Sequence, residues 1–243
     1  MRSKIVSLLA VTFSLGFAQA ASAADMPTKA PIVNAPVAVP FSWTGFYVGV
    51  DAGYHWNKVG IFNPATPASG TAEANPNSFT AGGHAGYLYQ FNNPLVVGVE
   101  GDVSWLNGND NGPFPGFPTQ GIIATTRWDA SVRGILGYAM DGTLFYATGG
   151  WSWMNGGMCA VVPYPTPLTC LTATSGPSTV DGWTVGGGVA HAFTNNLIAR
   201  VEYLYADYGS FSYTGTSWTG GTVNVTDRTS KVRVGLSWKF GPM

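Results

Sequence analysis

Residues 229–240 read TSKVRVGLSWKF, and this stretch decides the fold. From Val232 onward every second residue in it is apolar: Val232, Val234, Leu236, Trp238 and Phe240. The residues between them are charged, polar or small: Lys231, Arg233, Gly235, Ser237 and Lys239. Successive side chains of a β-strand point to opposite faces, so the pattern predicts a strand with one apolar and one polar face.

The same period of two recurs upstream. The eight predicted strands are residues 44–57, 78–91, 95–106, 126–140, 143–153, 182–193, 197–206 and 229–240. Three connections are tight turns, Asn92-Asn93-Pro94, Asp141-Gly142 and Thr194-Asn195-Asn196, and they alternate with connections of about 20 to 28 residues. Short turns at one end and long loops at the other are typical of outer-membrane barrels.

The composition fits a surface that faces lipid. Charged residues make up 9% of the chain, against roughly 25% in soluble domains, and aromatic residues make up 14%. After the N-terminal segment no apolar run approaches the roughly 20 residues of a helical span. A soluble lipocalin-like barrel or sandwich is the alternative, but its outer face would hold too few charges. We therefore predict an all-β fold: an eight-stranded antiparallel up-and-down transmembrane β-barrel of the outer-membrane type.

The N-terminus has the pattern of an export signal. Arg2 and Lys4 precede an apolar run over residues 5–18, and Ala21-Ser22-Ala23 is a small-x-small cleavage pattern. We predict a signal peptide over 1–23, with cleavage after Ala20 as the alternative, a Pro-rich periplasmic lead-in over 24–42 and the barrel over 43–243. Removal of the signal leaves 9 basic against 12 acidic residues, which argues against a nucleic-acid partner. The expected location is the outer membrane of a Gram-negative bacterium.

The polar faces of the strands carry most of the charge. The candidate site residues on these faces are Asp51, Glu100, Asp102, Arg127, Asp129, Arg133, Arg200, Glu202, Lys231 and Arg233. The lumen of an eight-stranded barrel is filled by side chains, and buried charges must be paired. The set predicts an ion-pair network in the lumen. Two interpretations stay open: a structural plug, or groups that line and gate a narrow water path.

Other chemistry in the sequence is sparse. Cys159 and Cys170 both lie in the loop between residues 153 and 182, where an oxidising compartment favours a disulfide. Free thiols or a metal pair are the alternatives. His55 lies at a height suited to an outer-rim catalytic group, but no nucleophile motif accompanies it. If the protein were an enzyme, His55→Ala would abolish turnover. We expect no enzyme activity, no cofactor and no metal.

Several motifs carry a family resemblance. They are ADMPTKAP (residues 24–31), WTGFYVG (43–49), GWTVG (182–186), RVEYLY (200–205) and VRVGL (232–236). As a set they resemble the OmpA-like, opacity-like porin-family barrels of alphaproteobacteria, often named outer-membrane immunogenic proteins. The sequence departs from this pattern at two places. Ala190 stands where similar proteins usually carry an acid, and Gly241-Pro242-Met243 follow the last aromatic residue.

The resemblance implies a function. Members of the family are structural surface proteins that support envelope integrity and display external loops, so it supplies no catalytic residues. The expected partners are outer-membrane lipid and lipopolysaccharide, the barrel-assembly machinery during biogenesis, and an external surface partner of the loops. A narrow porin-like channel or small-ligand passage through the lumen is the alternative function.

Overall fold

The computed structural model describes residues 41–65, 67–114, 117–161, 172–173, 178–214 and 222–240. Eight long strands form the body of this part of the chain. They are β1 (Gly45–Phe62), β3 (Ser78–Gln90), β4 (Leu95–Phe114), β5 (Phe117–Met140), β6 (Thr143–Val161), β8 (Thr179–Ala192), β9 (Leu197–Thr214) and β10 (Thr222–Phe240). Each pairs antiparallel with its neighbours along the chain.

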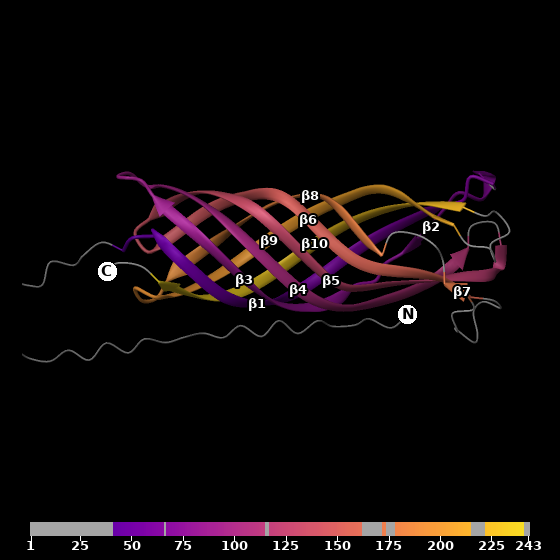
Figure 1. Ribbon diagram of the computed structural model, residues 1–243, viewed down its shortest axis with the longest axis horizontal. Helices are drawn as coiled ribbons and strands as arrows, with labels where there is room; N and C mark the ends of the chain where they lie inside the picture. The colour runs from indigo at the N-terminus through magenta and orange to yellow at the C-terminus, as the bar shows by residue number, and fades with distance from the viewer. Residues whose placement is uncertain are drawn as a thin grey trace, which may run out of the picture. The chain divides into compact units, whose positions relative to one another are not determined.

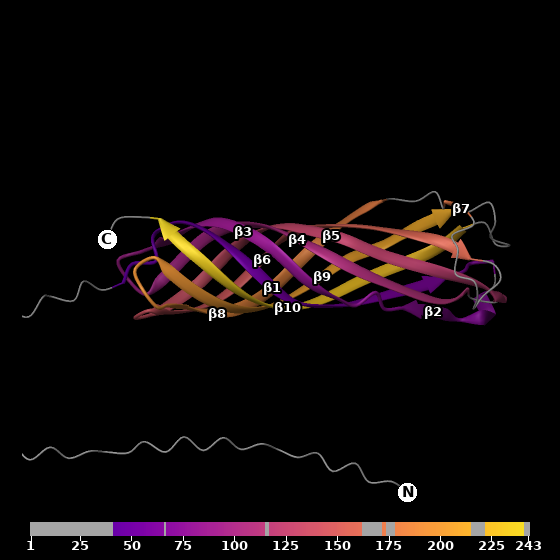
Figure 2. The same ribbon diagram turned by 90° about the horizontal axis from the view of Figure 1, so that it is seen from below.

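The sheet closes on itself through the first and last long strands. β1 pairs with β10 from Phe46↔Phe240 to Phe62↔Asn224, which completes a ring of the eight long strands. Figures 1 and 2 show the strands inclined around one long axis. The predicted up-and-down meander is therefore confirmed, and a closed ring leaves no strand edge to be satisfied in lipid.

One end of the barrel carries the three tight turns and the ends of both terminal strands. In the turn between β5 and β6, Asp141 has a φ of 51°, a left-handed conformation that Asp tolerates. In the turn between β8 and β9, the Thr194 hydroxyl accepts a hydrogen bond from the Leu197 amide at 3.0 Å. In an outer-membrane barrel this short-turn end faces the periplasm.

At the other end the strands run farther than predicted. The periplasmic ends agree with the prediction to within two residues, but β1 continues from 57 to 62, β4 from 106 to 114, and β6 from 153 to 161. Three short elements adjoin this end in Figures 1 and 2: β2 (Thr71–Ala74) pairs with β1, β7 (Thr172–Ala173) pairs with β6, and η1 (Pro67–Ser69) is a 3-10 turn. We call the strand segments that lie beyond the level of Trp56 on β1, at the end away from the tight turns, the outer extension.

The sequence pattern did not predict the outer extension, because the apolar side chains there face the opposite side of the sheet from those in the rest of the barrel. Between the two ends, in what we call the membrane belt, large apolar side chains face outward and are exposed. Those that lie near the strand ends include Phe46, Trp56, Phe79, Phe91, Trp105, Tyr138, Phe145, Trp183, Phe193 and Trp238. In the outer extension the apolar side chains turn inward and are buried: Val59, Ile61, Ile122, Ala124, Val223 and Val225.

Register shifts separate the two regions on three strands. They fall between Trp105 and Gly108 on β4, between Thr126 and Trp128 on β5, and between Thr226 and Arg228 on β10. The last of these lies opposite Gly209, which has a φ of 69°, a backbone conformation that favours glycine in a bulge. On β5 the bulge shifts the inward face by one residue, which breaks the strict alternation on which the prediction depended. On β10 the alternation of buried and exposed residues continues without a break, and only the kind of side chain that faces inward changes. Within the described residues, no helix is long and apolar enough to cross a membrane.

Candidate functional site

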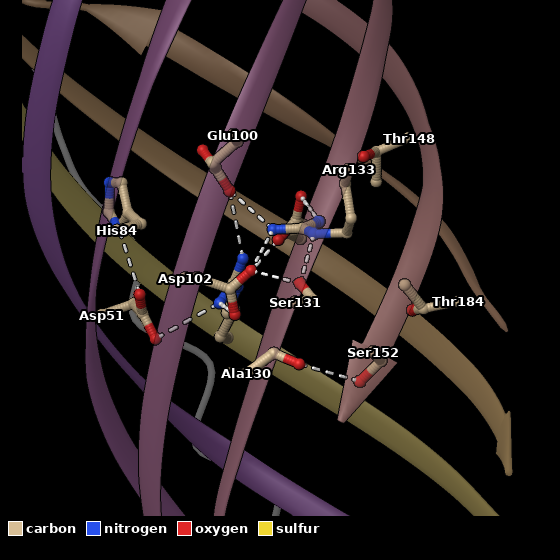
Figure 3. Close-up of polar contacts among 12 residues, drawn as sticks. Asp51, His84, Glu100, Asp102, Ala130, Ser131, Arg133, Thr148, Ser152 and Thr184 are labelled. Atoms are coloured by element: carbon tan, nitrogen blue, oxygen red, sulfur yellow. Dashed lines mark hydrogen bonds and ion pairs between the residues drawn. The ribbon is translucent and has the colours of Figure 1, made fainter. Parts of the chain in front are cut away.

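The candidate site is a network of buried charges halfway along the lumen, and Arg133 on β5 holds its centre. The Nη2 group of Arg133 donates to Glu100 Oε1 at 2.6 Å and to Asp102 Oδ2 at 3.0 Å. Its Nη1 group donates to Glu202 Oε1 at 3.0 Å. Figure 3 shows Arg133 reaching across toward Glu100 and Asp102, with Ser131 beside it. Arg133 therefore joins β4 and β9, which are not neighbours in the ring.

A second guanidinium, that of Arg233 on β10, contacts the same acids from another side. It donates to Asp102 Oδ1 at 2.9 Å and to Glu202 Oε2 at 2.7 Å. Its Nη1 lies 3.6 Å from Asp51 Oδ1. Arg233 and Glu202 are also direct partners in the register of β10 and β9. Because each acid is shared, removal of one base leaves several carboxylates without compensation.

Arg200 on β9 completes the network by an ion pair with Glu100 on β4. In the ring, β4 and β9 are separated by three long strands in either direction. The pair therefore spans the width of the barrel. The network acids and bases are buried, with Glu100, Arg133, Glu202 and Arg233 at 1% exposure or less.

Polar residues that we had not included among the candidates belong to the network. His84 on β3 lies between Asp51 and Ser237, with Nδ1 3.0 Å from Asp51 Oδ2 and Nε2 2.7 Å from Ser237 Oγ. Figure 3 shows His84 and Asp51 facing each other at one side of the network. The hydroxyl groups of two tyrosines donate to network acids: Tyr47 to Glu100 at 2.7 Å, and Tyr146 to Glu202 at 3.2 Å. All three residues lie on the polar face of their predicted strands, and this position is the signal that could have found them.

Lys231 and Asp129 form a separate ion pair between β10 and β5, nearer the outer extension. Asp129 on β5 faces Ser104 on β4 in register, two residues from the pair of Asp102 with Ser131. The structure thus brings nine of the ten candidate residues into the lumen, and all nine have a charged partner in the network or its neighbouring pair.

The placement of Arg127 in the lumen was wrong. Its side chain is exposed, whereas Asp129 and Arg133 on the same strand are buried. The physical reason is the register shift of β5 against β6: Thr126 pairs with Gly156 and Trp128 with Asn155, so Arg127 is the extra residue of a bulge. A bulge changes the face to which the following side chains point, and simple alternation across residue 127 does not hold.

Above the network lies a tier of buried polar groups that we call the upper polar band. It consists of His55, Asn57, Ser78, Thr80, Ser104 and Thr229, all buried. They lie on adjoining strands: His55 faces Ser78, and Asn57 faces Thr229. Their side-chain atoms include both ring nitrogens of His55, and they find no hydrogen-bond partner within the described chain. Buried polar groups are satisfied by ordered water when protein offers no partner, so this band is expected to hold water.

The buried position of His55 bears on the question of catalysis. Its exposed fraction is 0%, and it lies below the apolar interior of the outer extension. A substrate at the outer rim would not reach it. Within the residues that the structure describes, no group of three His, Cys, Asp or Glu side chains is placed to hold a metal ion.

Asp227 on β10 is a buried acid of the outer extension. It pairs in register with Val59 and lines a small cavity with Val225, Tyr213 and Met154. The pKa of Asp227 is raised to about 7: burial raises it most, the neighbouring Asn57 amide partly opposes this, and the negative charge of Asp207 adds to the rise. At neutral pH this carboxyl is therefore about half protonated.

Two other predictions fall wholly or partly outside the described chain. Cys159 is disulfide-bonded, while Cys170 lies outside the described residues. The signal peptide over 1–23 and the lead-in up to residue 40 also lie outside them, so both stay predictions.

Comparisons with known proteins agree with this architecture. Residues 8–240 match the family model described as "Outer membrane protein beta-barrel domain". The chain belongs to this family of outer-membrane β-barrels. It is 32% identical to the 31 kDa outer-membrane immunogenic protein of Brucella melitensis, over 96% of this chain and 99% of that protein. It is 30% identical to the 22 kDa outer membrane protein of Rhizobium leguminosarum bv. viciae, over 85% of this chain and 82% of that one.

A solved structure supports the fold independently. The outer membrane protein OprG from Pseudomonas aeruginosa superimposes with a TM-score of 0.52 at 14% identity, covering 82% of this chain and 97% of OprG. The family and the relatives above place the protein in the outer membrane of a Gram-negative bacterium as a surface barrel. The relatives are named as outer-membrane proteins and not as enzymes.

Proposed function

We propose that this protein is a sealed structural barrel, which supports the envelope and displays its outer loops without conducting solutes. The observation that carries the proposal is the ion pair of Glu100 with Arg200, which joins opposite strands of the ring. Arg133 and Arg233 each contact Glu100 of that pair and also Glu202. A lumen crossed by paired, fully buried groups offers no continuous water path at this height.

The alternative function is a narrow channel, and the upper polar band is the observation that favours it. Water held by His55, Asn57 and their neighbours would fill the lumen above the network. Below the network, Trp43, Leu88, Val96, Ile135, Leu144 and Ile198 form an apolar cluster at the periplasmic end. Hydrated groups next to an apolar cluster fit a blind aqueous pocket better than a pore, because ions would have to cross the apolar zone without compensation.

Single-channel conductance in a planar lipid bilayer tests the proposal. The purified barrel is refolded, and folding is verified by heat-modifiable gel migration. We expect a silent bilayer for the unmodified protein. Arg133→Ala is expected to open discrete steps by removing three ion pairs, while Arg127→Ala, on the same strand but exposed, stays silent. Reproducible steps from the unmodified protein would reject the sealed barrel and establish the channel.

The outer loops are the second part of the proposal. They leave from the outer extension, whose outward side chains such as Lys58, Asn111 and Arg228 are exposed and polar. A lipopolysaccharide-rich leaflet and an external surface partner would meet this region first. Its role in display is tested by replacing each loop with a short Gly-Ser linker. If a variant still folds, as shown by heat-modifiable gel migration, but no longer binds the external surface partner, the interaction belongs to the replaced loop. If the variant does not fold, the loop has a structural role.

A further inference from the structure

A small cavity lies in the periplasmic half of the lumen, next to the charge network. Its volume is about 30 Å³. Its apolar walls come from Trp43, Leu88, Ile135, Leu144, Ala190 and Ile198. A cavity needs roughly 10–15 Å³ to hold one water molecule. The space therefore suits an occupant of one to a few atoms.

The charged group that lines this cavity is Arg200, and its guanidinium is only partly used. One nitrogen, Nη1, donates to Glu100, but Nε and Nη2 have no acceptor among the described residues. The side chain is 5% exposed. The residues directly across from it are Ala190 on β8 and Gly235 on β10. Neither neighbour has a polar side chain, so neither can take the remaining N–H groups.

A second unused donor lines the same cavity. The indole Nε1 of Trp43 is buried and lacks an acceptor in the described part of the chain. The other polar groups of the wall already have partners: Tyr47 donates to Glu100, Tyr146 donates to Glu202, and Ser237 bonds with His84. All the unpartnered polar atoms that line the cavity are thus N–H donors, from Arg200 and Trp43.

We propose that this cavity binds a small monovalent anion, such as chloride, through the free N–H groups of Arg200 and the indole of Trp43. A buried donor left unsatisfied costs about 1–3 kcal/mol, and more when it is charged. An anion accepts hydrogen bonds from every direction and needs none in return, which matches a wall whose unpartnered atoms are all donors. The volume excludes a large anion, and the apolar walls exclude one with a wide hydration shell.

Bromide tests the site directly, because it replaces chloride and scatters X-rays anomalously. Crystals of the refolded full barrel are grown with sodium bromide as the only halide salt. The proposal expects an anomalous peak within hydrogen-bond distance of Arg200 Nε or Nη2. In solution, the midpoint of thermal unfolding should rise with halide concentration, relative to gluconate at the same ionic strength, because a ligand bound to the folded state stabilises it.

Three variants locate the effect. Trp43→Phe keeps the ring but removes the indole donor, and it is expected to weaken halide affinity about tenfold, the value of one hydrogen bond to a charged group. Ala190→Glu places a carboxylate opposite Arg200 and should abolish the halide response. Trp238→Phe removes an exposed indole from the lipid face and should leave the response unchanged.

The outcomes separate the anion from water. Water density without an anomalous peak, together with no halide response in the unmodified protein, overturns the proposal. A halide response that persists in both Trp43→Phe and Ala190→Glu would also overturn it, since the halide would then act elsewhere. If Ala190→Glu fails to fold, the anomalous peak and the Trp43→Phe titration still decide. Conductance does not enter this test, so its result is independent of the sealed-barrel proposal.

Discussion

The membrane belt and the outer extension are built from the same eight strands, but their interiors and exteriors are exchanged. In the belt Val234 and Leu236 face outward and Arg233 faces inward; nine residues earlier on the same strand Val225 is buried and Asn224 is exposed. The solvent explains the exchange. Where the barrel is surrounded by lipid, apolar side chains are favourable on its outer face. Where it is surrounded by water, they are favourable in its interior. The pairing of β1 with β10 runs through both regions without a register shift, because backbone pairing does not depend on which face is apolar.

The largest effect is expected from breaking the charged interior of the belt. Arg233→Ala leaves Asp102, Glu202 and Asp51 short of a cation and should destabilise the barrel by about 3–5 kcal/mol. Arg228→Ala on the same strand removes an exposed pair with Asp207 and should cost less than about 1 kcal/mol. Urea unfolding in lipid vesicles measures both. Equal losses would show that burial does not govern the strength of these pairs.

The second effect concerns pH in the outer extension. Asp227 has a folded pKa of about 7 against an ordinary value of 3.8. The unfolded carboxyl ionises first, so the extension loses stability as pH rises from about 4 to about 7, and the loss is complete above 7. At about 1.4 kcal/mol for each pKa unit, the loss is at most about 4 kcal/mol.

Amide hydrogen exchange at the outer end of β10, corrected for the intrinsic rate at each pH, follows this change. Asp227→Asn should remove the pH dependence, whereas Asp181→Asn, at an exposed site, should preserve it. Protection that is independent of pH in the unmodified protein would mean that Asp227 ionises normally.

A third experiment compares the outward faces on β9. Val201→Lys puts a charge in the middle of the belt and should cost about 2–4 kcal/mol. Ser210→Lys puts the same charge on the exposed face of the outer extension and should cost less than about 0.5 kcal/mol. Unfolding in vesicles gives the difference. If both substitutions cost the same, the boundary between lipid and water lies farther out than the change in pattern indicates.

The smallest effect separates two adjacent residues of β5. Ile122 is buried in the apolar interior of the extension, and Ile123 points the other way and is only half-buried. Ile122→Val should cost about 0.5–1.5 kcal/mol, and Ile123→Val should cost less. Thermal melts of the two variants, measured together, provide the comparison. A larger loss from Ile123 would contradict the assigned faces.

Much of the belt could be predicted from alternation, because lipid on one side and buried charge on the other give a strong period of two. The outer extension could not, since its period is interrupted on β5 and its apolar face changes sides. Arg127 and Arg133 illustrate the limit: both follow the same alternation, but the bulge at Arg127 directs its side chain outward.

The partners within the network were also only partly accessible. Arg233 and Glu202 are cross-strand neighbours, so their contact follows from the order of the strands. Glu100 and Arg200 meet across the ring, which depends on closure of the barrel and on side-chain length. The hydrogen bonds of Tyr47 and His84 depend on the same three-dimensional detail, and no pattern along the chain encodes it.

The outer extension also sets a height. β1 continues six residues beyond Trp56 to Phe62; at about 3.3 Å per residue and a tilt of about 40°, this is a rise of roughly 15 Å. The long loops therefore begin at the level of surface saccharides and not at the lipid headgroups. Access of a bulky molecule such as an antibody to these loops then depends on how far the neighbouring sugar chains extend from the membrane. The length of the outer extension sets the height of the loops relative to those chains.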